Sequence, residues 1–376
     1  MLTYHTAGHS HGELLIGILQ GFPAHVPIDE EFINKTLERR QGGYGRSKRM
    51  SIEKDRIEFV AGVWKGETTG APIGLLIKNK ASKSQDQVRP RTIPRPGHAD
   101  LAGAWKYGWE HDFNPVIERS SARETAMRVA IGSICQLLLK GFGIELLGHV
   151  KQLGSVSPDI PDLNLSQMRN LVEVSPFYCC DPQADQKMKE LIDSKTEEGN
   201  SLGGIVEVLV ENVPPGLGGF KHLEFRLDAQ IAQALMSIPS VKAVEIGEGL
   251  AGADKPGSEV HDEIKIQNGK IQRSTNNSGG IEGGMTNGQQ IIVRAYHKPI
   301  PTMIRGIASI DLLDGSATKA PYIRSDVVVI PAASVVAEAM VAFILTKALL
   351  DKFGHDHFGD IRENLQKYLK RIKYYG

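Results

Sequence analysis

The chain has 376 residues, of which 41% are hydrophobic and 23% charged, and its 44 basic and 44 acidic residues give zero formal net charge. This balance excludes the overall basic field of a dedicated nucleic-acid-binding protein, and the length allows a sizeable buried core. Cys135, Cys179 and Cys180 form neither a disulfide framework nor a zinc pattern. The N-terminal stretch MLTYHTAGHSH lacks the basic and apolar regions of a signal peptide, so we expect a reducing, cytoplasmic location.

The sequence predicts helices and strands that are interleaved along the chain. Asp29 can cap a helix that carries Phe32, Ile33 and Leu37 on its apolar face and ends near Gly42. The further elements follow in order: a strand at 71–79, a helix with a capping box of Ser121 and Glu124 that stops at Gly141 or Gly143, a strand at 205–213, a helix at 227–238 and a strand at 289–297.

The most apolar stretch, residues 327–350, contains Pro331 and Glu338, which favours a buried core helix over a membrane span. No composition change separates two parts of the chain, and the elements follow no regular βαβ rhythm. The sequence therefore predicts an α+β fold in one compact unit.

Two segments are candidates for binding an anion. RRQGGYGRSKRM, residues 39–50, combines glycines with Arg40, Arg46 and Arg49, whose guanidinium groups can bind carboxylate or phosphate bidentately. ERSSARET, residues 118–125, places arginines and serines at a predicted helix start, where free N–H groups attract anions. The alternatives are a solvated charged loop and an ordinary helix cap with exposed arginines.

Other motifs point to a ligand with less specificity. SGGIEGGMTNG at 278–288 could pack closely on a flat cofactor or a phosphate, or it could form a long hairpin loop. Lys298 in HKPIPTM could pair with a phosphate. His11 and His98 are candidate proton donors, and His9 with His11 also suggests a metal pair. Arg324 and Asp326 could bind an anion and relay a proton, or form a surface ion pair.

Taken together in their order along the chain, these segments resemble the chorismate synthase family over nearly the whole length. The blocks that carry the resemblance are GHSHGELLIGILQGFPA, RRQGGYGRSKRM, RPRPGHADLAGAWKYG, ERSSARETAMRVAIGSI, VKAVEIG, NNSGGIEGGMTNG, KPIPT and RSDVVVIPAASVVAEAM. The resemblance implies a single-domain β-α-β sandwich spanning residues 1–376. It also implies a lyase that eliminates phosphate from 5-enolpyruvylshikimate 3-phosphate to give chorismate, with reduced FMN (FMNH2) as cofactor.

The resemblance also implies roles for individual residues. His11, His98 and Asp326 match the catalytic positions. The substrate-binding positions match Arg40, Arg46, Arg49, Arg95, Ser121, Ala122 and Arg123. The flavin contacts match Arg119, Ser120, Ser121, Pro239, Ser240, Gly283, Lys298, Pro299, Ile300, Pro301, Thr302 and Arg324. Arg40 and Arg46 also match positions assigned to NADPH, which some members use to reduce their own flavin.

The family further implies a homotetramer with a small-molecule substrate, without a metal, a nucleic acid or a membrane as partner. Two features depart from the family pattern. His9 stands where a glutamate usually precedes the Ser-His pair, and the segment KYGWEHDFNPVIERSS is one residue longer, contains Pro115 and lacks the usual arginine-aspartate pair.

Two other function classes compete with this assignment. A metal-dependent hydrolase built on His9 and His11 would need further His and Asp ligands, and the sequence offers no convincing set. A nucleic-acid binder built on the arginine loop is opposed by the neutral net charge and by the lack of interleaved aromatic residues.

Overall fold

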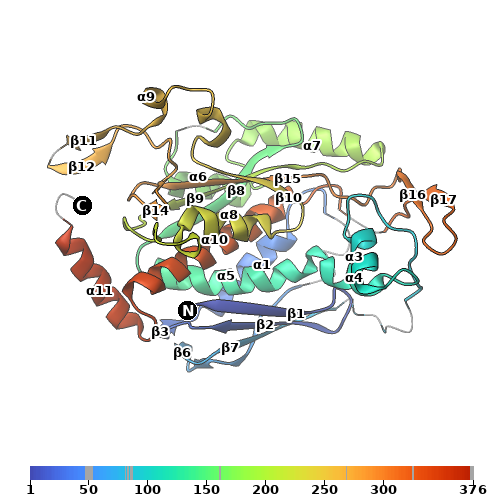
Figure 1. Cartoon of the computed structure of the whole chain (residues 1–376), viewed down its shortest axis with the longest axis horizontal. Helices are drawn as coiled ribbons and strands as arrows, with labels where there is room; N and C mark the ends of the chain where they lie inside the picture. The colour runs from blue at the N-terminus through green and yellow to red at the C-terminus, as the bar shows by residue number, and fades with distance from the viewer. Residues whose placement is uncertain are drawn as a thin grey trace.

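The computed structural model describes residues 1–46, 54–80, 82, 84, 88–160, 162–267, 269–323 and 326–372. Two antiparallel four-stranded sheets enclose a layer of helices (Figure 1). The first sheet has the order β1 (Thr3–Gly8), β2 (Leu14–Gln20), β7 (Ile73–Lys78), β4 (Glu58–Ala61). The second has the order β10 (Val241–Ile246), β15 (Ile291–His297), β9 (Gly204–Glu211), β8 (Glu145–Leu153). The helices between them are α1 (Glu30–Gln41), α5 (Thr125–Lys140) and α10 (Ile330–Phe353). The predicted α+β class is confirmed.

Helix α10 forms the centre of the core because it is apolar on all sides. It packs against α5 on one side and against β8 and β9 on the other. Among the described residues, α10 alone is long and apolar enough to cross a membrane, and 94% of its apolar window is buried inside the protein. The prediction of a buried core helix is therefore confirmed.

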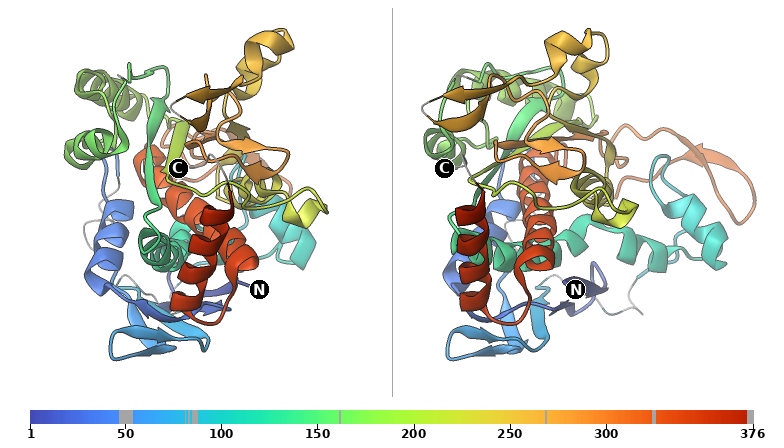
Figure 2. Two further views of the ribbon diagram at one scale, coloured as in Figure 1. Left: turned by 90° about the vertical axis from the view of Figure 1, so that its left-hand side faces the viewer. Right: turned by 60° about the vertical axis from the view of Figure 1, so that its left-hand side comes forward.

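The remaining elements pack on and around this three-layer arrangement. They are β3 (Ala24–Pro27), β5 (Val63–Trp64), β6 (Glu67–Thr69), α3 (Asp100–Tyr107), α4 (Asn114–Ser120), α6 (Leu165–Val174), α7 (Pro182–Glu197), α8 (Leu227–Met236), α9 (Gly257–Val260), β11 (Ile264–Gln267), β12 (Lys270–Arg273), β13 (Ile281–Glu282), β14 (Met285–Thr286), β16 (Ala308–Ile310), β17 (Ala317–Lys319) and α11 (Phe358–Arg371). Figure 2 shows α3, α4 and the β16–β17 hairpin side by side at one end of the molecule.

Local signals fixed the ends of α1 correctly. The Asp29 side chain accepts a hydrogen bond from Phe32 N, and Gly42 ends the helix. The predicted strands at 71–79, 205–213 and 289–297 and the helix at 227–238 correspond to β7, β9, β15 and α8.

The capping box predicted for Ser121 and Glu124 is wrong. The Ser121 hydroxyl accepts from Arg123 N at the start of a 3₁₀ turn, Ala122–Glu124, and α5 begins at Thr125. The Glu124 carboxylate instead accepts from Arg128 Nε at 2.9 and 3.0 Å and from the Thr6 hydroxyl at 3.0 Å. Glu124 therefore bonds Thr6, on another element, and Arg128, one turn further along the helix, instead of capping the helix start.

Candidate active site

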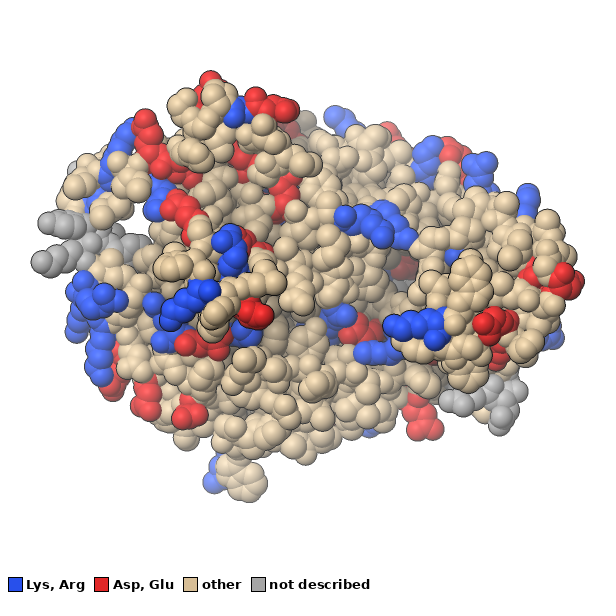
Figure 3. Space-filling view, viewed as in Figure 1, with Lys and Arg blue, Asp and Glu red and all other residues tan. Residues whose placement is uncertain are grey.

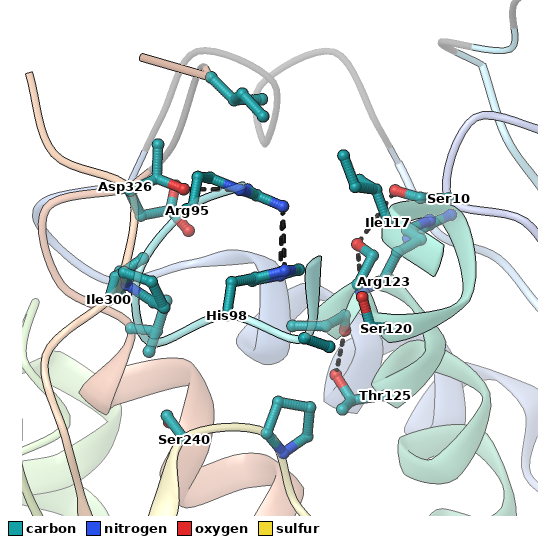
Figure 4. Close-up of a pocket in the computed structure, with 18 of the residues that line it drawn as sticks. Ser10, Arg95, His98, Ile117, Ser120, Arg123, Thr125, Ser240, Ile300 and Asp326 are labelled. Carbon is teal, nitrogen blue, oxygen red and sulfur yellow. Dashed lines mark hydrogen bonds between the residues drawn. The ribbon is translucent and has the colours of Figure 1, made fainter. Parts of the chain in front are cut away.

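A cavity of about 1160 Å³ opens between the α3–α4 end of the molecule, the start of α5 and the turn before β10. Most of the predicted site residues line it, although they come from distant parts of the chain: His11, Arg40 and Arg46, Arg95 and His98, Ser120 to Arg123, Pro239 and Ser240, Lys298, Ile300 to Thr302, and Asp326. Ser10, which was not predicted, lines it as well. Figure 3 shows basic side chains on both sides of a hollow in this face. In Figure 4, His98 and Asp326 lie across the cavity from Ser10 and Arg123.

One wall of the cavity holds two arginines around a single carboxylate. Arg123 Nη1 lies 2.7 Å from Asp55 Oδ2, and Arg40 Nη1 lies 3.6 Å from the same oxygen. All three residues are at most 5% exposed. The Arg40–Asp55–Arg123 cluster therefore carries one excess positive charge in a site with little water, where a charge that lacks a partner is costly.

The free donors of this cluster are buried at the cavity wall. Among the described residues, two donors of the cluster, Arg123 Nη2 and Arg40 Nη1, have no hydrogen-bond partner, against one unpaired acceptor, Asp55 Oδ1. The nearby Ser120 hydroxyl is buried without a described partner as well. Burial, together with the smaller effect of the neighbouring Arg123, lowers the pKa of Arg40 to about 10 despite the nearby Asp55. Excess charge and unpaired donors at one wall are the properties of a site for an anion.

The other donors of Arg40 and Arg123 hold the cluster in place. Arg40 Nε donates to the Thr125 hydroxyl at 3.0 Å, and its Nη2 donates to the carbonyl of Ala122 at 2.9 Å. Arg123 Nε donates to Asn79 Oδ1 at 2.8 Å. The two forks are thus positioned before any ligand arrives, which reduces the cost of ordering them on binding.

Asn79 connects this cluster to the loop that carries His11. Its Nδ2 donates to the carbonyl of His9 at 3.1 Å and to that of Gly12 at 2.7 Å. The side chain is 6% exposed. Asn79 therefore fixes both the Arg123 fork and the backbone of the His11 loop.

Glu118 holds His11 at the edge of the cavity. Its Oε1 lies 2.6 Å from His11 Nδ1, and its Oε2 accepts from His11 N at 2.7 Å. Burial would raise the pKa of Glu118, but the two His11 hydrogen bonds outweigh it and lower that pKa. The ionised carboxylate can only accept, so His11 Nδ1 carries a proton.

Asp100 plays the same part for His98. It accepts from His98 Nδ1 and, at 2.7 Å, from Arg95 Nε. Burial would raise the pKa of Asp100, but the hydrogen bonds from His98 and Arg95 lower it far below its usual range. Arg95 Nη2 lies 3.1 Å from His98 Nδ1 and 3.3 Å from His98 Nε2. Because the two distances are similar, Arg95 contacts the edge of the imidazole and does not donate to one nitrogen alone.

Two further contacts connect the loops around the cavity. Arg46 Nη1 lies 2.9 Å from Asp326 Oδ2, which joins the arginine loop to the chain before α10. Arg95 Nη1 donates to the Thr302 hydroxyl at 3.0 Å, which joins the His98 loop to the segment after β15. In that same segment Lys298 donates to the carbonyl of Gly97. Burial, and then the nearby Lys242, lowers the pKa of Lys298.

Some predicted site residues lie elsewhere in the structure. The exposed Arg119 donates to the Thr6 carbonyl and hydroxyl, and Gly283 lies in the β13–β14 hairpin. Neither of them, nor Pro299, is among the described residues that line the cavity. Arg49 and Arg324 are outside the described residues.

The carboxylates and the amide that position these groups were missed by sequence reasoning. Asp55, Asn79, Asp100 and Glu118 belong to no motif that names them as site residues. Their presence could have been predicted in kind, because several arginines and histidines in one pocket need nearby carboxylate or amide oxygens as hydrogen-bond acceptors.

The HxH pair does not form a metal site with other described residues. His9 is exposed, while His11 contacts Glu118. Within the described part of the chain, no three His, Cys, Asp or Glu side chains are placed to hold a metal ion. His9 instead adds a nearby positive charge when it is protonated, which contributes to the lowered pKa of Glu118.

Comparison with known proteins agrees with the fold. The chorismate synthase family model matches residues 2–350. The chorismate synthase of Pelobacter propionicus is 47% identical over 392 aligned positions, covering 99% of this chain and all of the relative. That of Carboxydothermus hydrogenoformans is 44% identical and covers all of both chains. A crystal structure of chorismate synthase, 38% identical, superposes with a TM-score of 0.82 over 100% of this chain and 99% of the other. The chain belongs to the chorismate synthase family, a family of lyases.

Proposed function

We propose that the cavity binds 5-enolpyruvylshikimate 3-phosphate beside reduced FMN and that its residues support the elimination of phosphate to give chorismate. The observation that carries the proposal is the buried donor excess of the Arg40–Asp55–Arg123 cluster. A cavity of about 1160 Å³ exceeds the roughly 300–1,000 Å³ of a typical small-molecule site. It therefore has room for a cofactor and a substrate together.

The basic residues suit a substrate with a phosphate and two carboxylates. The Arg40–Asp55–Arg123 cluster offers guanidinium edges on one wall, and Arg46, Arg95 and Lys298 line other parts of the cavity. The charge that grows on a departing phosphate is stabilised by donors that already point at it. Ser121 is less available, because its hydroxyl donates to Ser10 at 3.1 Å and accepts from Arg123 N.

The residues on the opposite wall fit a flat, partly polar cofactor. Ile238 and Ile300 give apolar surface, the Ser240 hydroxyl and the Lys298 ammonium give polar contacts, and the Ser120 hydroxyl adds a polar group from the arginine side of the cavity. The buried Ser120 hydroxyl has no partner among the described residues, which supports a ligand contact there. Reduced FMN, when bound, supplies electron density that oxidised FMN cannot supply. Binding of NADPH could use only the Nη1 edge of Arg40, which lies near Arg46, because Nε and Nη2 already donate to Thr125 and Ala122.

The histidines and Asp326 are the proposed proton-handling groups. Glu118 and Asp100 hold the Nδ1 atoms of His11 and His98, so each ring can give or take a proton at Nε2. Asp326 is held by Arg46 at 2.9 Å and can accept a proton at its carboxylate. His11 and Asp326 both line the cavity, and Ser10, which precedes His11, lies across it from Asp326 in Figure 4. Protons can therefore be delivered and removed at separate points.

We also propose a homotetramer in a reducing, cytoplasmic environment. Support for assembly comes from apolar side chains on the outer face of the first sheet: Ile16 and Ile18 are 39% exposed and Val60 is 60% exposed. The three cysteines are free, which is consistent with a reducing compartment. Light scattering of the purified protein tests the tetramer directly.

The substrate-binding proposal is tested by Arg123→Lys, which keeps the charge and removes the fork. We expect the KM for the phosphorylated substrate to rise at least tenfold. Arg169→Gln is the control, because Arg169 is a partly exposed arginine paired with Glu145 outside the cavity. An unchanged KM in Arg123→Lys would contradict the proposed anion site.

A further inference from the structure

A buried histidine, His297, ends β15. The residues of β15 alternate in burial, and His297 occupies an inward position in line with Ile291, Val293 and Ala295. Its side chain is 5% exposed. An imidazole placed in such an apolar row loses its hydration, so its hydrogen bonds need an explanation.

His297 makes one side-chain hydrogen bond within the described structure, and it is directed at a residue of the cavity wall. His297 Nδ1 lies 2.9 Å from the Ser240 hydroxyl, and Ser240 lines the cavity. The other ring nitrogen, Nε2, is buried and has no hydrogen-bond partner among the described residues. Burial lowers the pKa of His297 to about 4, so the ring is neutral at physiological pH and carries one proton.

The backbone around Ser240 is held in an uncommon conformation. Ser240 has a φ of 76°, in the left-handed region that non-glycine residues rarely adopt. Its carbonyl accepts from Lys298 N at 3.0 Å, and Val241 pairs with His297 across the sheet. His297 and Lys298 therefore hold both the backbone and the hydroxyl of Ser240, and Figure 4 shows the position of Ser240 at the cavity. Such strain is typical of residues that must present a group to a ligand.

The single proton of neutral His297 determines what Ser240 can do. If Nε2 carried the proton, this buried N–H would have no acceptor, and the Ser240 hydroxyl would donate its hydrogen to Nδ1. If Nδ1 carries it, His297 donates to the Ser240 oxygen and the serine hydrogen remains for the cavity. Buried N–H groups without an acceptor are rarer than unsatisfied acceptors, which favours the second arrangement.

We propose that His297 is a positioning residue that donates Nδ1–H to Ser240 and thereby holds the Ser240 hydroxyl as a hydrogen-bond donor to an acceptor atom of the flavin. This inference rests on the proposed flavin site, and it adds a residue outside the described cavity lining that acts on the ligand through Ser240. The flavin atom that fits such a hydroxyl is a ring carbonyl or an unprotonated ring nitrogen.

The first test is a double-mutant cycle on binding of FMN, measured by quenching of its fluorescence without turnover. We expect Ser240→Ala and His297→Met each to raise the dissociation constant about five- to tenfold, and the double variant to match Ser240→Ala. His297→Asn, which can place an amide donor near the position of Nδ1, should restore affinity to within about twofold of wild type. Effects that multiply in the double variant, or an unchanged affinity in His297→Met, would overturn the proposal.

The second test does not depend on flavin. Solid-state NMR of ¹⁵N-histidine-labelled protein at pH 7, with His297 assigned by its loss in His297→Met, should show the ring proton on Nδ1. A proton on Nε2 would overturn the proposed direction of the hydrogen bond. A wild-type protein that bound no FMN would instead refute the flavin site, while the NMR result would still decide the state of His297.

Discussion

Asp55 is the residue whose change separates stability from ligand binding most clearly. Asp55→Asn keeps the size of the side chain but removes the charge between two buried guanidinium groups. Breaking a buried ion pair by removing one partner costs about 3–5 kcal/mol, and the retained amide oxygen places this case near 3. At about 2.1 cal/mol/K per residue, the unfolding entropy of 376 residues is about 0.8 kcal/mol/K, so Tm should fall by about 4 °C.

The same change should strengthen binding of phosphate. The cluster charge rises from one to two, and a unit charge about 8 Å from a ligand anion contributes about 2 kcal/mol at an effective dielectric constant of about 20. Screening reduces this value, so we expect the dissociation constant for inorganic phosphate to fall roughly tenfold. The Tm gained on adding phosphate should therefore be larger in the variant than in wild type.

The assay is thermal unfolding with and without phosphate, together with calorimetric titration of phosphate. Asp254→Asn is the matched control, because Asp254 is exposed and outside the cavity. A variant with unchanged Tm would show that Asp55 does not balance the two arginines. Weaker phosphate binding in Asp55→Asn would refute the view that this cluster is the anion site.

Three further predictions follow from the histidines. Glu118→Gln should lower the rate of phosphate release about 10- to 100-fold without unfolding the protein, because the carboxylate fixes the tautomer of His11. Glu118→Asp should keep partial activity, and equal rates in wild type and Glu118→Gln would contradict this role. His11→Ala and His98→Ala should each lower turnover by about one to three orders of magnitude, and wild-type turnover in both would remove their roles. The pKa of His297 is about 4 in the folded protein and about 6.5 in the unfolded chain. Between pH 4 and 6.5 the unfolded state therefore binds more protons than the folded state, so acidification through this interval lowers the free energy of unfolding. Urea unfolding at pH 7 and 4.5 should show wild type losing about 2 kcal/mol more than His297→Met, and an equal loss in both would refute a buried neutral ring.

Local signals in the sequence predicted much of the fold. The Asp29 cap and the Gly42 stop define α1 because both act within one turn of the helix. The 327–350 stretch predicted α10 because it is the most apolar part of the chain, while Pro331 and Glu338 within it argue against a membrane span. The start of α5 was wrong because Glu124 pairs with Arg128 and Thr6, and Thr6 lies on another element.

The site could be predicted only in its cationic and histidine parts. The residues that hold those groups come from distant segments: Asp55 lies 68 residues from Arg123, and Glu118 lies 107 residues from His11. No spacing rule relates such positions, since the fold alone brings them together. His297 was hidden for a different reason, because its importance depends on the inward side of β15 and on the Ser240 turn beside it.

The central claim is that this cavity supports elimination of phosphate only with reduced flavin beside the substrate. Anaerobic turnover of 5-enolpyruvylshikimate 3-phosphate, followed by phosphate release with chemically reduced FMN and separately with oxidised FMN, tests it most directly. The account predicts release of phosphate and formation of chorismate with reduced FMN and none with oxidised FMN alone. Equal release with oxidised FMN, or without any flavin, would contradict it.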